Sequence, residues 1–304
     1  MNDTTYALKK ANINISQKYN KIIFIGPKLA PINRLCEYTT TNLAQYLVDG
    51  YLHGSVSSMD YTEYSDLDTL FIIKKEVLEN AKEIKKLARL FIKSNKFLYE
   101  FDPLQHHGHF FLMETDLKCY NQAILPLPAI RLSTSILGQG MNLVFSIRDS
   151  KDEIELRFLE SIQIIRRYAT KDVNRLNSLY YLKGFLSHFM ILPVLFLQLK
   201  GEYVSKKESF EVLRKRIGDK EWQCVQKVSS IRKNWRQFTS SYKNTIMKII
   251  NKQNPLLFPY VARLIYQKYP LCHKLFNPNL LHEMYDFTIY LFKLSGLNAS
   301  KLEY

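Results

Sequence analysis

Two aspartates one residue apart, Asp66 and Asp68, stand at the start of the apolar run Leu70–Ile73. Because side chains alternate between the two faces of a strand, both carboxylates are expected on one side and Leu67 on the other. Two adjacent negative charges repel each other, and a divalent cation with oxygen ligands removes that cost. Mg²⁺ usually takes one or two carboxylates together with substrate phosphates. The pair therefore predicts a magnesium site at the mouth of a buried strand.

Gly54 and Ser55 end a short apolar segment and precede Asp66 by a ten-residue spacer. Glycine lets the backbone approach a phosphate closely, and successive amide N–H groups can form an anion-binding nest there. A phosphate cradle followed closely by a metal-binding pair suggests an enzyme that handles a nucleoside triphosphate.

These residues resemble a known family. Gly54-Ser55, the spacer, and Ser65-Asp66-Leu67-Asp68 running into an apolar strand are similar to the core of the DNA polymerase β-like nucleotidyltransferase superfamily. The resemblance covers roughly residues 35–115 and says little about the remainder of the chain. It implies that Gly54, Ser55 and Ser65 contact a bound NTP and that the aspartates hold two Mg²⁺ ions.

The superfamily generally places a third acid on a strand that follows the helix after the aspartate pair. Here the segment after the expected helix Lys74–Asn95 predicts two strands, Phe97–Asp102 and Gln105–Met113. Asp102 is the best candidate for the third catalytic and metal-binding acid, with Glu100 on the same face as the alternative. The charges of the preceding helix are expected to form a solvated face.

Three histidines follow within four residues, His106, His107 and His109. His107 has two interpretations: it contacts the triphosphate or accepts the proton of the attacking group, or it is a structural histidine held by hydrogen bonds. The structural interpretation is favoured for His106. Isolated ligands at this spacing make a poor zinc site.

Composition and charge bound the class of protein. The chain has 304 residues, of which 46% are hydrophobic, and this length and composition suit a globular protein of two lobes. Residues 1–150 hold 17 Lys and Arg against 15 Asp and Glu, whereas residues 151–304 hold 26 against 13. The second half therefore carries +13 of the net charge of +15 and should attract polyanions.

The expected fold is α+β: a small mixed β-sheet core flanked by helices over residues 1–150, followed by a basic helical bundle over residues 151–304. Helical periodicity begins near Glu153 and continues to Leu294, with breaks at glycines and prolines. Two basic runs, Lys206–Lys220 and Arg232–Arg236, could contact nucleic acid, although Trp222 and Trp235 at helical spacing are more often core residues.

Cellular location is inferred from what the sequence contains. The four cysteines are widely spread and predict neither a zinc site nor a disulfide framework, which suits a reducing cytoplasm. The N-terminal residues lack a signal-peptide pattern. The apolar stretch Gly184–Leu199 is shorter than a bilayer span and predicts a buried helix kinked at Pro193, so no membrane association is expected.

Three functions remain open. The first is Mg²⁺-dependent transfer of a nucleoside monophosphate from an NTP to a hydroxyl of an RNA end or another anionic acceptor, with release of pyrophosphate. The second is synthesis of a nucleotide second messenger by the same chemistry. The third is a non-catalytic nucleotide- or RNA-binding module. The oligomeric state and the identity of the acceptor are not predicted.

Overall fold

The computed structural model divides the chain into two compact units, residues 1–149 with 244–261 and residues 150–243 with 262–304. The segment 244–261 thus belongs to the first unit, although it follows helices of the second unit along the chain. The structure describes residues 8–26, 28–235, 245–247, 249–251, 254, 256–265 and 278–302. The N-terminal five residues, the middle of the expected helix 220–252 and the breaks at Pro255 and Pro270 lie outside the described residues.

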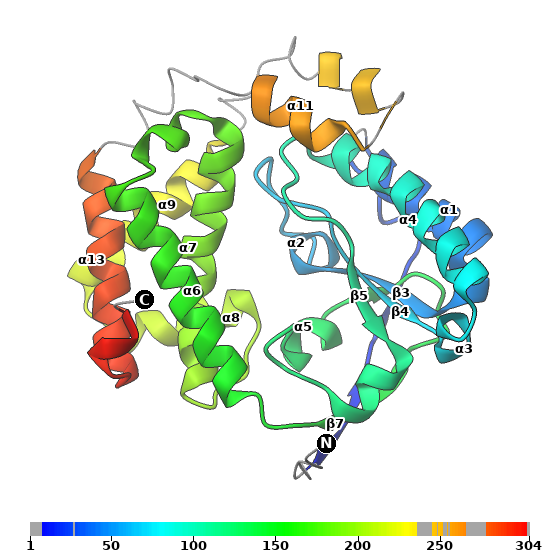
Figure 1. The fold of residues 1–304 in the computed structure, drawn as a ribbon, viewed down its shortest axis with the longest axis horizontal. Helices are drawn as coiled ribbons and strands as arrows, with labels where there is room; N and C mark the ends of the chain where they lie inside the picture. The colour runs from blue at the N-terminus through cyan, green and yellow to red at the C-terminus, as the bar shows by residue number, and fades with distance from the viewer. Residues whose placement is uncertain are drawn as a thin grey trace. The chain divides into compact units, whose positions relative to one another are not determined.

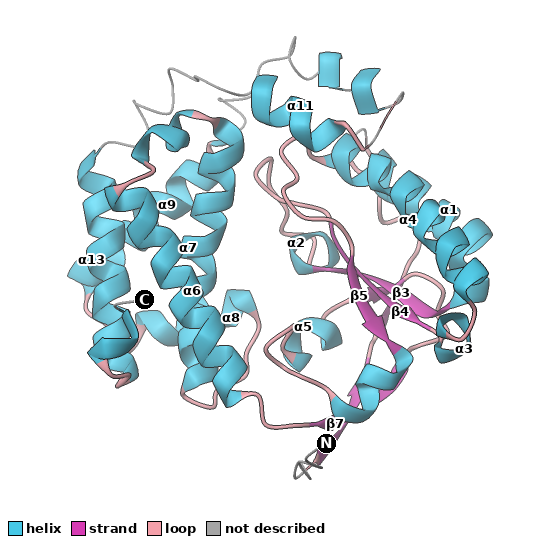
Figure 2. Cartoon of the chain, viewed as in Figure 1, coloured by secondary structure: helices cyan, strands magenta, loops and turns pink. Residues whose placement is uncertain are grey.

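A five-stranded mixed sheet is the centre of the first unit (Figure 2). The strand order is β2-β6-β3-β4-β5. The central pair β3 and β4 is antiparallel, β5 is parallel to β4, β6 is antiparallel to β3, and β2 is parallel to β6. Their bounds are β2 Gln17–Lys18, β6 Thr134–Ser135, β3 Leu47–His53, β4 Asp68–Ile73 and β5 Phe110–Met113.

Both faces of this sheet are buried, which explains why β4 reads as a continuous apolar run. Phe71 and Ile73 belong to a core with helices α1 (Ala30–Tyr38) and α4 (Ala81–Phe101). Leu70 and Ile72 belong to the opposite core, with α5 (Leu127–Arg131) and the two-stranded antiparallel sheet of β1 (Lys9–Asn14) and β7 (Asn142–Ile147). Short helices α2 (Gly54–Ser57) and α3 (Lys75–Leu78) follow β3 and β4.

The second unit is helical. Its helices are α6 Lys151–Thr170, α7 Leu179–Leu199, α8 Lys206–Arg214, α9 Asp219–Lys233 and α13 Pro278–Ser295. Helix α11 (Phe258–Ile265) crosses the division between the units. Shorter turns of 3₁₀ or π helix are Thr39–Leu43, Ala44–Tyr46, Glu114–Cys119, Val173–Asn177 and Ala299–Leu302.

Helix α7 is the one described helix that is long and apolar enough to cross a membrane. In its most apolar window 72% of the residues are buried inside the structure. The core helix of a globular unit satisfies the same criterion of length and composition, and Pro193 lies within α7 as the sequence predicts. Trp222 and Trp235, which are 5% and 1% exposed, are core residues.

The α+β fold class is therefore confirmed. One local prediction is wrong: residues Phe97–Phe101 are the last turns of α4 and not a strand. The apolar stripe that begins at Leu87 continues through Phe91 and Leu98 to Phe101, so burial against the sheet extends the helix. Strand β5 begins at Phe110, later than predicted.

Candidate active site

The Gly-Ser turn and the aspartate pair lie together at one end of the β3–β4 ladder. His53, the last residue of β3, pairs with Asp68, the first residue of β4. Gly54 follows with a φ of +67°, a conformation that side chains other than glycine rarely adopt. A β-carbon at Gly54 would lie 2.6 Å from Oδ2 of Asp68. The turn and the second aspartate are thus in direct contact.

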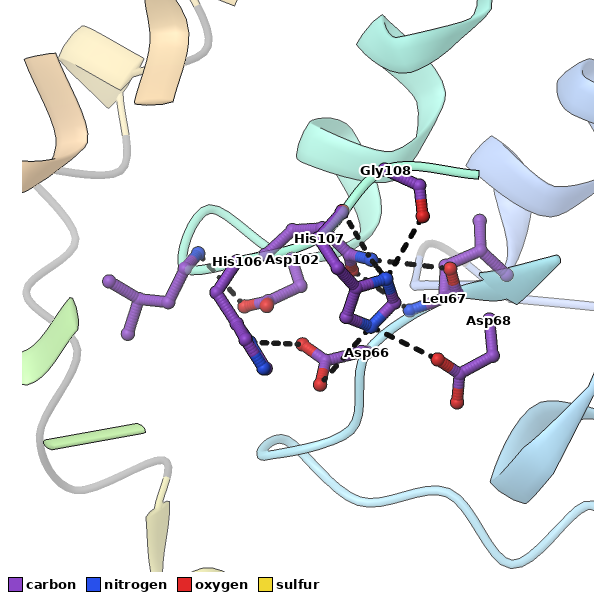
Figure 3. A network of polar contacts seen from close by, with 9 residues as sticks. Asp66, Leu67, Asp68, Asp102, His106, His107 and Gly108 are labelled. Carbon is purple, nitrogen blue, oxygen red and sulfur yellow. Dashed lines mark hydrogen bonds and ion pairs between the residues drawn. The ribbon is translucent and has the colours of Figure 1, made fainter. Parts of the chain in front are cut away.

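The two aspartate carboxylates converge on the ring of His107 (Figure 3). Nε2 of His107 lies 3.1 Å from Oδ1 of Asp68 and 3.9 Å from Oδ2 of Asp66. Oδ1 of Asp66 is also 3.7 Å from Nδ1 of His106. Although β4 begins only at Asp68, the two carboxylates share one side of the chain, as strand alternation predicts.

The positive charge of His107 balances the negative charges of Asp66 and Asp68. Burial lowers the pKa of His107, but the hydrogen bond to Asp68 and the charges of Asp68 and Asp66 outweigh it and raise the pKa to about 9. The charged ring donates from Nε2 to Asp68 and from Nδ1 to the carbonyl of Gly108, which is 3.0 Å away. Burial would raise the pKa of Asp68, yet the hydrogen bond from His107 and the charges of His53 and His107 hold it below its usual range.

Gln105 fixes the segment between the two aspartates. Its Oε1 accepts from the amide of Leu67 at 3.0 Å, and its Nε2 donates to the carbonyl of Leu67 at 3.3 Å. The same Nε2 lies 3.2 Å from the carbonyl of His107. Gln105 is only 2% exposed. One buried amide therefore joins the aspartate segment to the histidine segment.

His53 adds a buried polar group beside Asp68. The side chain is 6% exposed and packs against the ring of Phe110. Burial lowers the pKa of His53, the charge of Asp68 raises it, and the charge of His107 lowers it again. Its Nε2 has no hydrogen-bond partner among the described residues. Sequence reasoning missed His53 and Gln105; the position of His53 directly before Gly54 was the signal available for it.

The predicted third acid, Asp102, makes a local hydrogen bond at the end of α4. Asp102 ends α4, is 4% exposed, and its Oδ1 accepts from the amide of Leu104 at 3.1 Å. Figure 3 marks this hydrogen bond of the Asp102 carboxylate with a dashed line. The alternative, Glu100, pairs with Arg34 on α1 at 2.5 Å. The described residues contain no group of three His, Cys, Asp or Glu side chains arranged to hold a metal ion.

The remaining predicted residues are Ser55, in the short helix α2, and Ser65, in the loop before the aspartate pair. Ser55 is half-buried, and its carbonyl accepts from the amide of Asp60 at 3.0 Å. Ser65 is buried, and its hydroxyl accepts from the amide of Thr62 at 2.9 Å. The Ser65 hydroxyl thus closes the turn that leads into Asp66.

His109 is structural. It joins β4 to α4, with Nδ1 2.6 Å from the hydroxyl of Thr69 and Nε2 2.8 Å from the hydroxyl of Ser94. Burial, and then the charge of His107, lower the pKa of His109 to about 3, so the ring is neutral. The three clustered histidines therefore have different environments.

No family model matches the chain, and neither a curated protein nor a solved structure matches it.

Proposed function

We propose that the chain is a Mg²⁺-dependent nucleotidyltransferase that moves a nucleoside monophosphate from an NTP to an acceptor hydroxyl and releases pyrophosphate. The observation that carries the proposal is the contact of Gly54 with Asp68, together with the convergence of Asp66 and Asp68 on one point. Two carboxylates beside a glycine turn match the needs of a metal ion that also binds phosphates.

Three features suit a metal–triphosphate group at this place. The carboxylates of Asp66 and Asp68 are side by side, a β-carbon at Gly54 would fill the space beside them, and the buried Nε2 of His53 is without a hydrogen-bond partner among the described residues. Asp66 and Asp68 would hold the ion. Bound Mg²⁺ would neutralise the negative charge that develops on the α-phosphate and on the leaving pyrophosphate.

The protein side chains would bind and orient the triphosphate. Gly54 leaves the backbone open to a phosphate, because it is exposed and has no side chain. His107 carries a positive charge beside the aspartates and would therefore attract a nearby phosphate group electrostatically. Of the two active roles open to His107, contact with the triphosphate is favoured over acceptance of a proton.

The acceptor is inferred from charge. Residues 151–304 carry a net charge of +13, which favours an anionic acceptor such as an RNA end over a cationic small molecule. A nucleotide acceptor, which would make the product a second messenger, is equally compatible with this charge.

A second candidate is a nucleotide-binding module without transfer activity. It is favoured by one observation: the described residues contain no group of three His, Cys, Asp or Glu side chains arranged to hold a metal ion. In the superfamily that the two motifs resemble, a third acid generally joins the aspartate pair in holding two metal ions.

Labelled NTPs, Mg²⁺ and total RNA test the proposal. The wild-type protein is expected to move label into RNA or into a small nucleotide product, and the variant Asp66→Asn with Asp68→Asn is expected to lose this activity. Glu76→Gln, which removes an exposed acid of α3, is the matched control and should retain it. Unchanged transfer by the double variant contradicts the assignment of the pair. Binding of NTP without any transfer supports the second candidate.

A further inference from the structure

Helix α4 carries a row of six cations on one side. They are Lys82, Lys85, Lys86, Arg89, Lys93 and Lys96, here called the cation stripe. Because successive residues turn by about 100°, all six fall within an arc of about 100°. The row is about 21 Å long at the rise of an α-helix. Five of the six are exposed, and Lys96 is half-buried.

The charge of this stripe is hardly compensated. In the part of the chain that the structure describes, its one ion pair joins Lys86 to Glu83 at 4.0 Å, while Glu100, four positions after Lys96, pairs with Arg34 of α1. Among the described residues, Lys82, Lys85, Arg89 and Lys93 form no ion pair. Like charges three or four positions apart destabilise a helix. An acidic partner would remove this repulsion, whereas solvent only screens it.

An apolar groove runs beside the stripe. It has a volume of about 430 Å³ and lies between α3, α4 and the edge strand β5. Four large side chains that line it, Leu78, Ile84, Ile92 and Phe111, are each between 38% and 41% exposed, which is a large apolar surface for one small area. Ile84, Ala88 and Ile92 are spaced by four residues, so they form a row parallel to the cations.

We propose that this face of α4 and β5 binds an acidic amphipathic helix of another protein. Apolar residues of such a helix would enter the groove at helical spacing, and its acidic residues would face the cation stripe. The two parallel rows are the reason for this assignment, because a partner must satisfy both together.

Other classes of ligand would interact favourably with only one of the two rows, either the cations or the apolar side chains. RNA would use the cations, but it would leave the aliphatic row Ile84, Ala88 and Ile92 in contact with water. A lipid surface would meet the cations, but it would not fill a concave groove. A second copy of this chain brings more positive charge, since its net charge is +15.

The groove also reaches the site segment. Gly108 and His109 line it, and they directly follow His107. A bound partner would therefore contact the same short stretch of chain that holds the aspartate pair.

Two fluorescent peptides of equal composition, each about five helical turns long, test the proposal. In the first, leucines at helical spacing form one row with glutamates beside it; in the second, the same residues are scrambled. We expect the first to bind the full chain about tenfold more tightly than the second, by fluorescence anisotropy. Lys85→Glu with Arg89→Glu, and separately Ile84→Asp with Ile92→Asp, should each weaken binding about tenfold.

The matched control reverses two exposed cations of the same unit that lie off this face, Lys118→Glu with Arg131→Glu, and should leave binding unchanged. Circular dichroism verifies that each variant is folded. Equal affinity for the two peptides, or no binding of either, overturns the proposal. If oligouridine RNA binds with dependence on Lys85 and Arg89 while the peptides are not distinguished, the stripe is an RNA track instead.

Discussion

The α-carbon of Gly54 faces the carboxylate of Asp68 so closely that a single added carbon would lie 2.6 Å from Oδ2. Two motifs that are separated by a ten-residue spacer in the sequence are therefore one structural feature. The pairing of His53 with Asp68 across the β3–β4 ladder brings them together.

Gly54→Ala is expected to disturb this contact. The φ of +67° costs a residue with a β-carbon about 1–2 kcal/mol, and the clash with Asp68 adds to that. Urea unfolding should therefore show a larger loss of stability than Gly201→Ala, whose φ is +77° and whose β-carbon would meet no atom within 4 Å. Equal losses of stability in the two variants would mean that the Asp68 side chain moves aside without cost and that the Gly54 turn does not hold it in place. NTP binding by Gly54→Ala should fall in parallel.

The sequence predicted this relationship because both signals are local. Alternation places two aspartates on one side, and an apolar run marks the strand that carries them. The strand predicted for Phe97–Asp102 is wrong for an equally local reason. Phe97–Phe101 fits a strand by alternation, but it also continues the apolar stripe of α4, and burial of that stripe against the sheet favours the helix.

Contacts between residues far apart in the sequence could not be predicted in this way. Asp49 is fully buried and accepts hydrogen bonds from Ser135, Leu137, Gln139 and Gly140 as well as from Gly50. The hydrogen bonds by which Gln105 holds Leu67, here called the Gln105 clamp, join residues 38 positions apart. Such contacts form only once the sheet has packed, and no spacing of residues in the sequence predicts them.

Gln105→Leu should loosen the aspartate segment. The substitution keeps the approximate size but leaves the amide and the carbonyl of Leu67 without their partner, and an unsatisfied buried polar group costs about 1–3 kcal/mol. We expect lower stability in urea and faster hydrogen exchange at the Leu67 amide. Gln45→Leu, at an exposed position, should change stability by about 0.5 kcal/mol or less. An unchanged exchange rate at Leu67 contradicts the role of the clamp.

His107→Asn should increase the affinity for Mg²⁺. The variant removes the positive charge that balances Asp66 and Asp68, so the two carboxylates repel each other. A bound divalent cation relieves this repulsion, which the imidazolium relieves in the wild-type protein. A tenfold gain in affinity corresponds to about 1.4 kcal/mol, measured by calorimetry. Adding Asp66→Asn and Asp68→Asn should abolish the binding. Weaker binding by His107→Asn would instead make His107 part of the metal-binding arrangement.

The neutral ring of His109 predicts how stability depends on pH. The pKa of His109 is lowered to about 3 by burial and by the charge of His107, whereas the unfolded chain titrates near 6.5. Between these values the unfolded state binds a proton that the folded state does not, so the contribution of His109 is complete above pH 6.5 and is lost as the pH falls toward 3.

His109→Asn removes this linkage. The free energy of unfolding of the wild-type protein should therefore fall more steeply below pH 6.5 than that of the variant, by up to about 1.4 kcal/mol per pH unit. Thr69→Val removes one hydrogen bond to the ring but keeps the histidine, so it should lower stability and retain the steep slope. Urea unfolding at several pH values measures the slopes. Parallel curves for the wild-type protein and His109→Asn would show that the ring is protonated in the folded state, which would contradict its burial between Thr69 and Ser94 as a neutral bridge.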